Sequence, residues 1–234
     1  MIDHAVVSHD EWLRARREFL GQEKAFTRER DRINAARLAL PWERLEQEYV
    51  FTGPRGQVTL ADLFHGCRQL IVYHFMYPPE WDGGCPHCSF WADNFDGNAA
   101  HLRARDISFV AVSRAPFDKL AAYRARMGWS FQWFSSGDST FNYDFGVSFS
   151  ADEQGKPVFN YGTAAPGMPD REAASAFFRD NGEIYHTYST YGRGIDLLNG
   201  TYNFIDISPL GRNEDPNDTQ SWVRRHDEYD DPDS

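Results

Sequence analysis

The stretch Cys85-Pro86-His87-Cys88 constrains this chain most strongly, because it sets two of the three cysteines one helical turn apart. Residues 69–76, which precede it, are mostly apolar or aromatic and predict a buried strand. Residues 89–105, which follow it, predict a helix. A C-x-x-C pair at a strand-to-helix junction is typical of a redox site. The segment therefore indicates an α/β fold built around this junction.

Each residue of the motif has a chemical reason to be there. Cys85 falls at the start of the helix, where unpaired backbone N–H groups and the helix dipole stabilise a thiolate. Pro86 suits the first helical position because it has no N–H to lose there. His87 can carry a positive charge beside Cys85 and lower its pKa. Cys88 lies one turn further on and can resolve a mixed disulfide formed by Cys85.

Composition and charge restrict the partners and the compartment that we expect. The chain has 234 residues, 41% of them hydrophobic, which suits one domain with added segments. A formal net charge of −11 argues against nucleic acid as a partner. We find neither a signal peptide at the N-terminus nor an apolar run long enough to cross a membrane, which favours a cytoplasmic location. Thiols are kept reduced there, so the motif is expected to be chemical rather than structural, and Cys67 reads as a small buried hydrophobe.

An N-terminal helical arm is expected over residues 1–42. Ser8 and Glu11 form a capping-box pattern, and a helix should follow to about Leu38, with a break near Gly21. The helix is highly charged and its apolar residues are unevenly spaced. We expect it to pack against the domain or against a second copy of the chain, which makes a homodimer one expected assembly.

Residues 43–212 should form the main domain, and residues 213–234 a flexible acidic tail with eight acidic residues and two arginines. Residues 129–170 look like a long insertion in place of a short connection, with many aromatic residues in the first half. The predicted elements of the domain are a hairpin of residues 48–52 and 57–60, the strand 69–76, the motif helix, a strand at 107–113, a helix between Pro116 and Gly128, a hairpin around Asn181-Gly182 and a short helix at 195–198.

Three segments of the chain resemble a bacterial thioredoxin-like family catalogued as a domain of unknown function. They are residues 69–95, which include Gly84-Cys85-Pro86-His87-Cys88, residues 141–149 (FNYDFGVSF) and residues 186–194 (HTYSTYGRG) within a likeness that runs from Val6 to about Gly211. The resemblance implies a thioredoxin-like three-layer α/β/α sandwich. By analogy within the superfamily it also implies thiol–disulfide chemistry, and it implies no known substrate.

The chain departs from the thioredoxin superfamily at one position. Thioredoxins place a cis-proline opposite the redox cysteines, just before the strand of the final hairpin. Counting back from Gly182, that position falls near Ala174, and the nearest proline is Pro169. Substrate docking in the usual thioredoxin manner is therefore in doubt.

The leading functional hypothesis is a thiol–disulfide oxidoreductase that acts on a protein or small-molecule disulfide or thiol. In this hypothesis Cys85 attacks, Cys88 resolves, His87 tunes the thiolate and Pro86 shapes the helix start. The hypothesis needs no cofactor and no resident metal.

A peroxiredoxin-like peroxide reductase is the first alternative. That family's motif has a proline, a threonine four residues later and a cysteine three residues after that. Pro78 and Cys85 hold the outer positions here, but Asp82 stands in place of the threonine. An ionised carboxylate would repel the thiolate and cannot donate a hydrogen bond to a peroxide.

Two further alternatives are a metal site and a binding module with the same fold. Cys85 and Cys88 could supply half of a four-ligand zinc or copper set, joined by His74 or His87. His74 stands in an apolar strand, and for that reason reads first as a core histidine. In a binding module the aromatic insertion would hold a ligand or a partner.

Three residues are candidates for substrate binding. Trp81 and Trp91 flank the motif and could line a groove, although packing in the core would explain them equally well. Arg193 follows a tyrosine-rich stretch and could bind an anion or stabilise a thiolate if its turn folds over the start of the motif helix.

Overall fold

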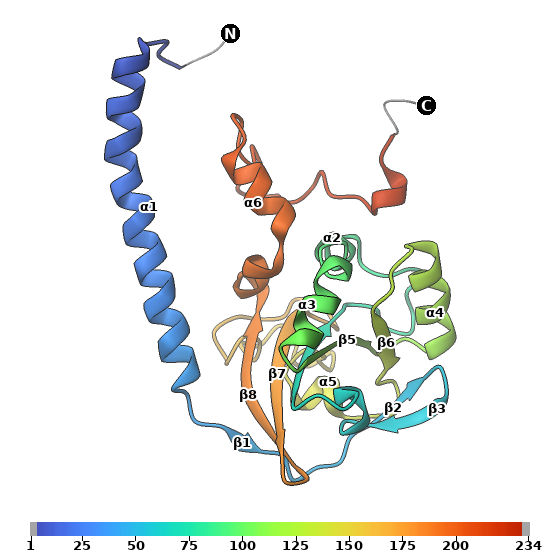
Figure 1. Ribbon diagram of the computed structural model, residues 1–234. Coiled ribbons are helices and arrows are strands. Elements are labelled where there is room, and N and C mark those ends of the chain that lie inside the picture. Colours follow the sequence, from blue (N-terminus) through green and yellow to red (C-terminus); the bar gives the residue numbers. More distant parts are fainter. Residues whose placement is uncertain (1–3, 231–234) are drawn as a thin grey trace. The chain divides into compact units, whose positions relative to one another are not determined.

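The structure is a computed structural model that describes residues 4–230 (Figure 1). The chain divides into two compact units, Met1–Pro41 and Trp42–Ser234. Among the described residues, no helix combines the length and the apolar character that a bilayer-spanning segment requires.

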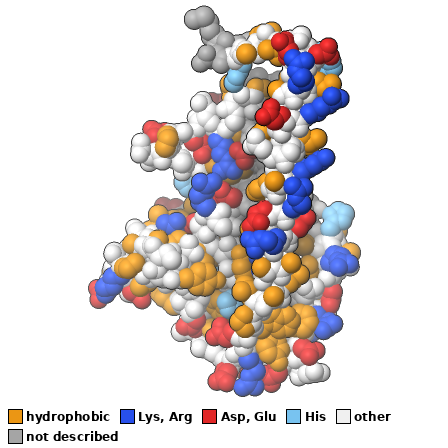
Figure 2. Space-filling model, turned by 90° about the vertical axis from the view of Figure 1, so that its left-hand side faces the viewer, with side chains coloured by type: hydrophobic (Ala, Val, Ile, Leu, Met, Phe, Trp, Pro, Cys, Tyr) orange, Lys and Arg blue, Asp and Glu red, His pale blue; other side chains and the backbone are white. Residues whose placement is uncertain are grey.

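The first unit contains a single helix, α1 (His9–Leu38). Its capping box forms as predicted: the Ser8 hydroxyl accepts a hydrogen bond from the Glu11 amide, and the Glu11 carboxylate accepts one from the Ser8 amide. The predicted break near Gly21 is absent, because one glycine costs only about 1 kcal/mol in a long helix. Acidic and basic side chains are interspersed on the face drawn in Figure 2.

The second unit is built on one mixed sheet of eight strands, in the order β1-β8-β7-β4-β5-β6-β2-β3. Strand β4 pairs in parallel with β5, and β5 pairs in parallel with β6, whereas β7 is antiparallel to both β4 and β8. The run β8-β7-β4-β5 is the strand order of the thioredoxin fold, which confirms the predicted fold class. The strands are β1 (Glu43–Arg44), β2 (Val50–Gly53), β3 (Gly56–Thr59), β4 (Gln69–His74), β5 (Ile107–Ser113), β6 (Gln132–Ser135), β7 (Ala173–Asp180) and β8 (Glu183–Tyr191).

Helical segments cover the two faces of this sheet unequally. The face that carries Tyr73 and Trp133 packs against side chains of α2 and α4 and against Ile195 and Tyr202. The opposite face carries Val72 and packs against the short segments η1 and α5. The helical segments of this unit are η1 (Asp62–Phe64), α2 (Pro86–Ala92), η2 (Asp96–Asn98), α3 (Ala99–Ala104), α4 (Phe117–Arg126), α5 (Phe141–Asp144), η3 (Gly192–Leu198), α6 (Gly200–Ile207) and η4 (His226–Glu228).

The bounds that we predict for the helix over residues 89–105 are wrong. It begins at Pro86, ends at Ala92, and resumes as α3 only at Ala99. In between, the Asp96 carboxylate accepts hydrogen bonds from the amides of Ser130 and Phe131, at 2.9 and 3.0 Å. These partners lie more than 30 residues away, so the local sequence pattern did not indicate the break.

The segment predicted as an insertion contains part of the sheet. Strand β6 and helix α5 both lie within residues 129–170. Trp133 points to the face covered by α2 and α4, and Phe134 points to the other face. The strand was missed because four residues are too few to show an alternating pattern. Beyond α5, Ser148 and Asp170 form an isolated β-bridge outside the eight strands, and β7 begins three residues after Asp170.

The acidic tail differs from the flexible segment that we predict. Val223 is buried, and Arg126 of α4 makes ion pairs with Asp227 at 2.7 Å and with Glu228 at 2.9 Å. Charge composition suggested a solvated segment, but these acidic side chains have a basic partner on the domain. The described part of the tail, to residue 230, therefore packs against the rest of the second unit.

A buried ion pair fixes the chain just before β7. The Asp170 carboxylate accepts hydrogen bonds from Arg114 Nε at 2.8 Å and from the Ser148 hydroxyl at 2.7 Å. Burial raises the pKa of Asp170, and the Ser148 and Arg114 contacts oppose that rise. This pair holds the segment that leads into the site described below.

We expect Arg114→Ala to lower the free energy of unfolding by about 3 kcal/mol, because it leaves the Asp170 carboxylate buried without its cation. Urea denaturation followed by circular dichroism measures the change. Arg44→Ala is the matched control: its ion pairs with Glu46 and Glu183 are exposed, so it should cost at most about 1 kcal/mol. Equal losses in the two variants would contradict the structural role of the buried pair.

Candidate functional site

The backbone holds the motif against the end of β4. The Cys85 amide donates to the Met76 carbonyl at 3.2 Å, and the Cys85 carbonyl accepts from the Ser89 amide at 3.0 Å. Pro86 occupies the first position of α2, as predicted. Cys85 therefore caps the helix start while remaining bonded to the segment that leaves the sheet.

Gly84 is required by close packing. A Cβ atom at this position would lie 2.8 Å from a Phe75 ring carbon and 2.9 Å from a Tyr123 ring carbon. Both rings belong to the buried core, so neither can move aside cheaply. Any larger residue would displace the backbone that positions Cys85.

Both motif cysteines are free thiols and both are buried, with 4% of Cys85 and 2% of Cys88 exposed. The Cys88 sulfur accepts a hydrogen bond from the Met76 amide at 3.4 Å. The phenol of Tyr73, which is fully buried, also lies beside Cys88, and burial raises its pKa well above the usual range. Cys67 is buried as well, as predicted.

The two thiols are driven to opposite protonation states. The hydrogen bond from the Cys88 thiol is the largest effect on Cys85, and it lowers the pKa of Cys85 well below its usual range. Burial opposes this shift, and the contact with His87 adds to it. Burial and the neighbouring Cys85 raise the pKa of Cys88 well above its usual range. The hydrogen bond to Cys85 raises the pKa of His87. The arrangement favours a Cys85 thiolate beside a protonated Cys88 and a cationic His87.

A cavity of about 260 Å³ opens beside the two sulfurs. Trp91 and Arg193 line it, so the structure places these two candidates at the motif. Trp91 is nevertheless mostly buried, and its indole N–H donates to the Ile195 carbonyl at 2.9 Å. Trp81 is not part of the lining and packs at the edge of the core.

Two residues directly before β7 also line the cavity and were not singled out in the sequence. Glu172 occupies the position just before the strand, close to where thioredoxins have their cis-proline, and Arg171 precedes it. Ala174, where we expected that position, lies inside the strand and pairs with Tyr73. Our count placed the start of β7 two residues too late, and the correct start would have indicated Arg171 and Glu172.

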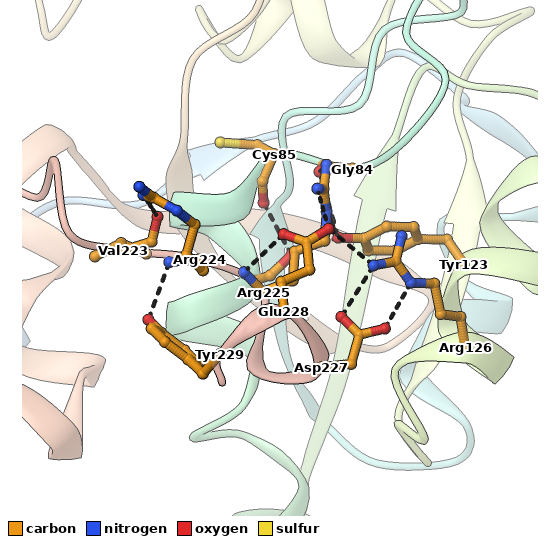
Figure 3. A network of polar contacts seen from close by, with 11 residues as sticks. Gly84, Cys85, Tyr123, Arg126, Val223, Arg224, Arg225, Asp227, Glu228 and Tyr229 are labelled. Atoms are coloured by element: carbon orange, nitrogen blue, oxygen red, sulfur yellow. Dashed lines mark hydrogen bonds and ion pairs between the residues drawn. The ribbon is translucent and has the colours of Figure 1, made fainter. Parts of the chain in front are cut away.

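The C-terminal segment closes one side of the site (Figure 3). Arg225 donates from one terminal nitrogen to the Gly84 carbonyl at 2.8 Å and from Nε to the Tyr123 hydroxyl at 2.7 Å. Its other terminal nitrogen pairs with Glu228 at 2.8 Å. Gln220, five residues earlier, lines the cavity, and its backbone accepts a hydrogen bond from His87.

His74, one of the alternative metal ligands, is a buried core residue as expected. Its Nε2 lies 2.8 Å from the Ser175 hydroxyl, and burial lowers its pKa to about 3. Within residues 4–230, no three side chains of the types His, Cys, Asp and Glu are grouped as a metal site would require. Asp82, which stands in the threonine position of the peroxiredoxin motif, is exposed and outside the cavity lining.

We expect the alkylation rate of Cys85 to stay constant as the pH is lowered through the usual range of thiol pKa values, because Cys85 remains a thiolate in that range. The rate should fall only at a pH well below it. Cys88→Ala should raise the midpoint of this pH profile most, since the Cys88 hydrogen bond is the largest stabilising contact. His87→Ala should raise it by about one pH unit. Mass spectrometry after iodoacetamide pulses gives the profiles, and His101→Ala, on the exposed helix α3, is the control. A wild-type midpoint in the usual thiol range would refute the thiolate.

Removing the Arg225 contacts should open the tail. Arg225→Ala deletes the charge-assisted hydrogen bonds to Gly84 and Tyr123, and we expect a bulky maleimide to modify Cys85 about tenfold faster. Hydrogen exchange over residues 219–230 should rise in parallel. Arg224→Ala is the matched control because, within the described residues, the Arg224 side chain donates to the carbonyls of Ser221 and Val223, which belong to the tail itself. Unchanged modification in Arg225→Ala would show that the tail does not limit access.

Three solved structures that are similar to this chain share less than 20% sequence identity with it. A peroxidoxin BcpB from Mycobacterium tuberculosis is 18% identical, with a TM-score of 0.47, over 70% of this chain and 96% of that one. Peroxiredoxin Q from Xanthomonas campestris is 18% identical, with a TM-score of 0.45, over 70% and 90%. A protein described as a thiol:disulfide interchange protein DsbE from Chlorobium tepidum is 16% identical, with a TM-score of 0.40, over 65% and 86%.

No curated protein matches the chain. A family model does match, and it covers residues 1–229, nearly the whole sequence. The chain therefore belongs to the family described as bacterial protein of unknown function, DUF899.

Proposed function

We propose that this protein is a thiol–disulfide oxidoreductase in which Cys85 is the nucleophile and Cys88 the resolving thiol. The observation that carries the proposal is the placement of two free thiols at the first turn of α2: Cys85 caps the helix start, and the Cys88 sulfur accepts a hydrogen bond from the Met76 amide at 3.4 Å. In this setting the pKa of Cys85 is lowered and that of Cys88 is raised. Only the thiolate attacks a disulfide, so the pair has one activated member and one held in reserve.

The geometry supports a two-step exchange. In the reducing direction the Cys85 thiolate attacks a substrate disulfide, forms a mixed disulfide and releases one substrate thiolate. Cys88 then attacks the Cys85 sulfur, closes the Cys85–Cys88 disulfide and releases the second thiolate. Two electrons pass from the protein dithiol to the substrate, and the reverse sequence oxidises a substrate dithiol.

His87 has a defined part in both directions. Its cationic ring stabilises the Cys85 thiolate, which is the attacking group in one direction and the leaving group in the other. The Met76 amide lies within hydrogen-bond distance of Cys88 and favours the thiolate that must form there during resolution. We assign Pro86 a positioning role at the helix start.

The test is a redox titration of the wild-type protein against glutathione, read as the mass added by alkylation of free thiols. We expect one reversible two-electron transition assigned to Cys85 and Cys88. A midpoint above about −200 mV would mark an oxidant or isomerase, and a midpoint near about −270 mV a reductant. Thiols that never form the disulfide would refute the proposal.

Single cysteine variants assign the two roles. Cys85→Ser should abolish exchange with a model disulfide, because no activated thiolate remains. Cys88→Ser should accumulate mixed disulfides on Cys85, seen as a mass increase that dithiothreitol reverses. Cys67→Ala should behave as wild type. Equal turnover in Cys85→Ser and wild type would refute the assignment of Cys85 as the nucleophile. Rapid peroxide consumption without disulfide exchange would favour a peroxide reductase instead.

A further inference from the structure

The cavity beside the motif is small and has walls from separate parts of the chain. Its volume of about 260 Å³ lies below the usual range for pockets that hold drug-sized ligands. The motif, the residues before β7, the turn after β8 and the tail each contribute side chains. Both redox cysteines border it, so a molecule bound there would lie next to Cys85.

The surface around the motif is already occupied by the protein's own tail. Arg225 donates a hydrogen bond to the Gly84 carbonyl, and His226 Nδ1 lies 2.7 Å from a carboxylate oxygen of Asp93. The Trp222 ring packs edge-on against Phe90, with 5.4 Å between the ring centroids. A folded protein substrate must bring a disulfide and its flanking backbone to Cys85, a residue that is only 4% exposed. The closed tail therefore favours small disulfides over proteins.

The cavity offers charges of both signs. Arg193 is 87% exposed at its mouth and lies 3.2 Å from Asp196. Deeper in, the buried Nε of Arg171 lies 3.3 Å from a carboxylate oxygen of Glu172 and forms an ion pair with it. The angle between them does not suit a hydrogen bond. An anionic or a cationic ligand would meet one favourable and one unfavourable partner, whereas a zwitterion can satisfy both.

A buried polar group also faces the cavity. The Tyr73 hydroxyl is fully buried and has no nitrogen or oxygen partner among the described residues, although it lies beside the Cys88 sulfur. A buried hydroxyl without such a partner is costly, and a bound polar molecule would relieve that cost. Tyr73 and the Arg171–Glu172 ion pair thus place polar groups in the wall of the cavity, which a polar molecule bound there would contact.

We propose that this cavity binds a low-molecular-weight amino-acid disulfide of the size of cystine. Arg193 receives the substrate carboxylate, and Glu172 and Asp196 receive its ammonium group. The proposal rests on the oxidoreductase function above and names its substrate class. Cys85 attacks one cystine sulfur, the S–S bond breaks and one cysteine leaves; Cys88 then displaces the second cysteine. Cystine is reduced by two electrons, and the protons of the Cys88 thiol and of the cationic His87 go to the two cysteines released.

The experiment measures single-turnover oxidation of the reduced full-length protein by four small disulfides, using acid quench and mass spectrometry. Cystine carries both charges, cystamine only ammonium groups, dithiodiglycolate only carboxylates, and bis(hydroxyethyl) disulfide neither. Each rate is divided by the rate of the same disulfide with dithiothreitol, which removes differences in intrinsic reactivity. Insulin serves as the protein disulfide.

We expect the normalised rate for cystine to exceed that for cystamine and for dithiodiglycolate by about tenfold, the effect of one charge-assisted hydrogen bond. Arg193→Gln should remove most of the preference over cystamine. Arg55→Gln, in the β2–β3 turn outside the cavity lining, should keep it. Insulin should react more slowly than cystine by a larger factor.

Each other outcome overturns a stated part of the argument. Equal normalised rates for the charged and neutral small disulfides would refute the charge recognition while leaving the exchange function intact. A rate for insulin equal to that for cystine would refute the selection by size. No reaction with any disulfide, bis(hydroxyethyl) disulfide included, would refute the proposed function itself.

Discussion

The burial of β4 on both of its faces is the constraint on which the rest of this domain depends. Leu70 and Val72 pack on one side and Tyr73 on the other, and β5 and β7 satisfy the backbone on the two edges. Full burial of each such side chain contributes roughly 1.5–3 kcal/mol. A strand fixed in this way delivers Met76 to a defined place, and the Met76 backbone in turn bonds to both Cys85 and Cys88.

The motif adds an electrostatic arrangement to this rigid frame. Burial alone would hold both thiols neutral, yet the hydrogen bond between them and the adjacent His87 give the charge to Cys85. The arrangement is asymmetric because Cys88 sits deeper, against Tyr73 and the sheet, while His87 reaches Cys85 from the exposed side of α2. The order of attack and resolution in the proposed reaction follows from this difference in depth.

Local sequence predicted those parts of the fold whose cause is local. Strand β5 was predicted residue for residue because seven consecutive residues suit a buried strand. The turn at Asn181-Gly182 was predicted because both residues adopt positive φ, at 49° and 88°, which this pair tolerates best. The break after α2 and the packing of the tail escaped prediction because Asp96 and Arg225 find their partners 34 and 141 residues away along the chain.

The same distinction applies to the site. Cys85, His87 and Cys88 could be found because one short motif holds them together. Arg171, Glu172 and Tyr73 could not, since only the folded sheet brings them beside that motif.

The contact between Arg225 and Gly84 ties the last described stretch of the chain to a motif made 141 residues earlier. A ribosome makes α2 long before it adds the segment that covers it, and domains begin to fold as they emerge. The two thiols therefore lack this cover during synthesis until the segment that carries Arg225 has been added. Any tag or fusion partner added at the C-terminus is attached to this cover.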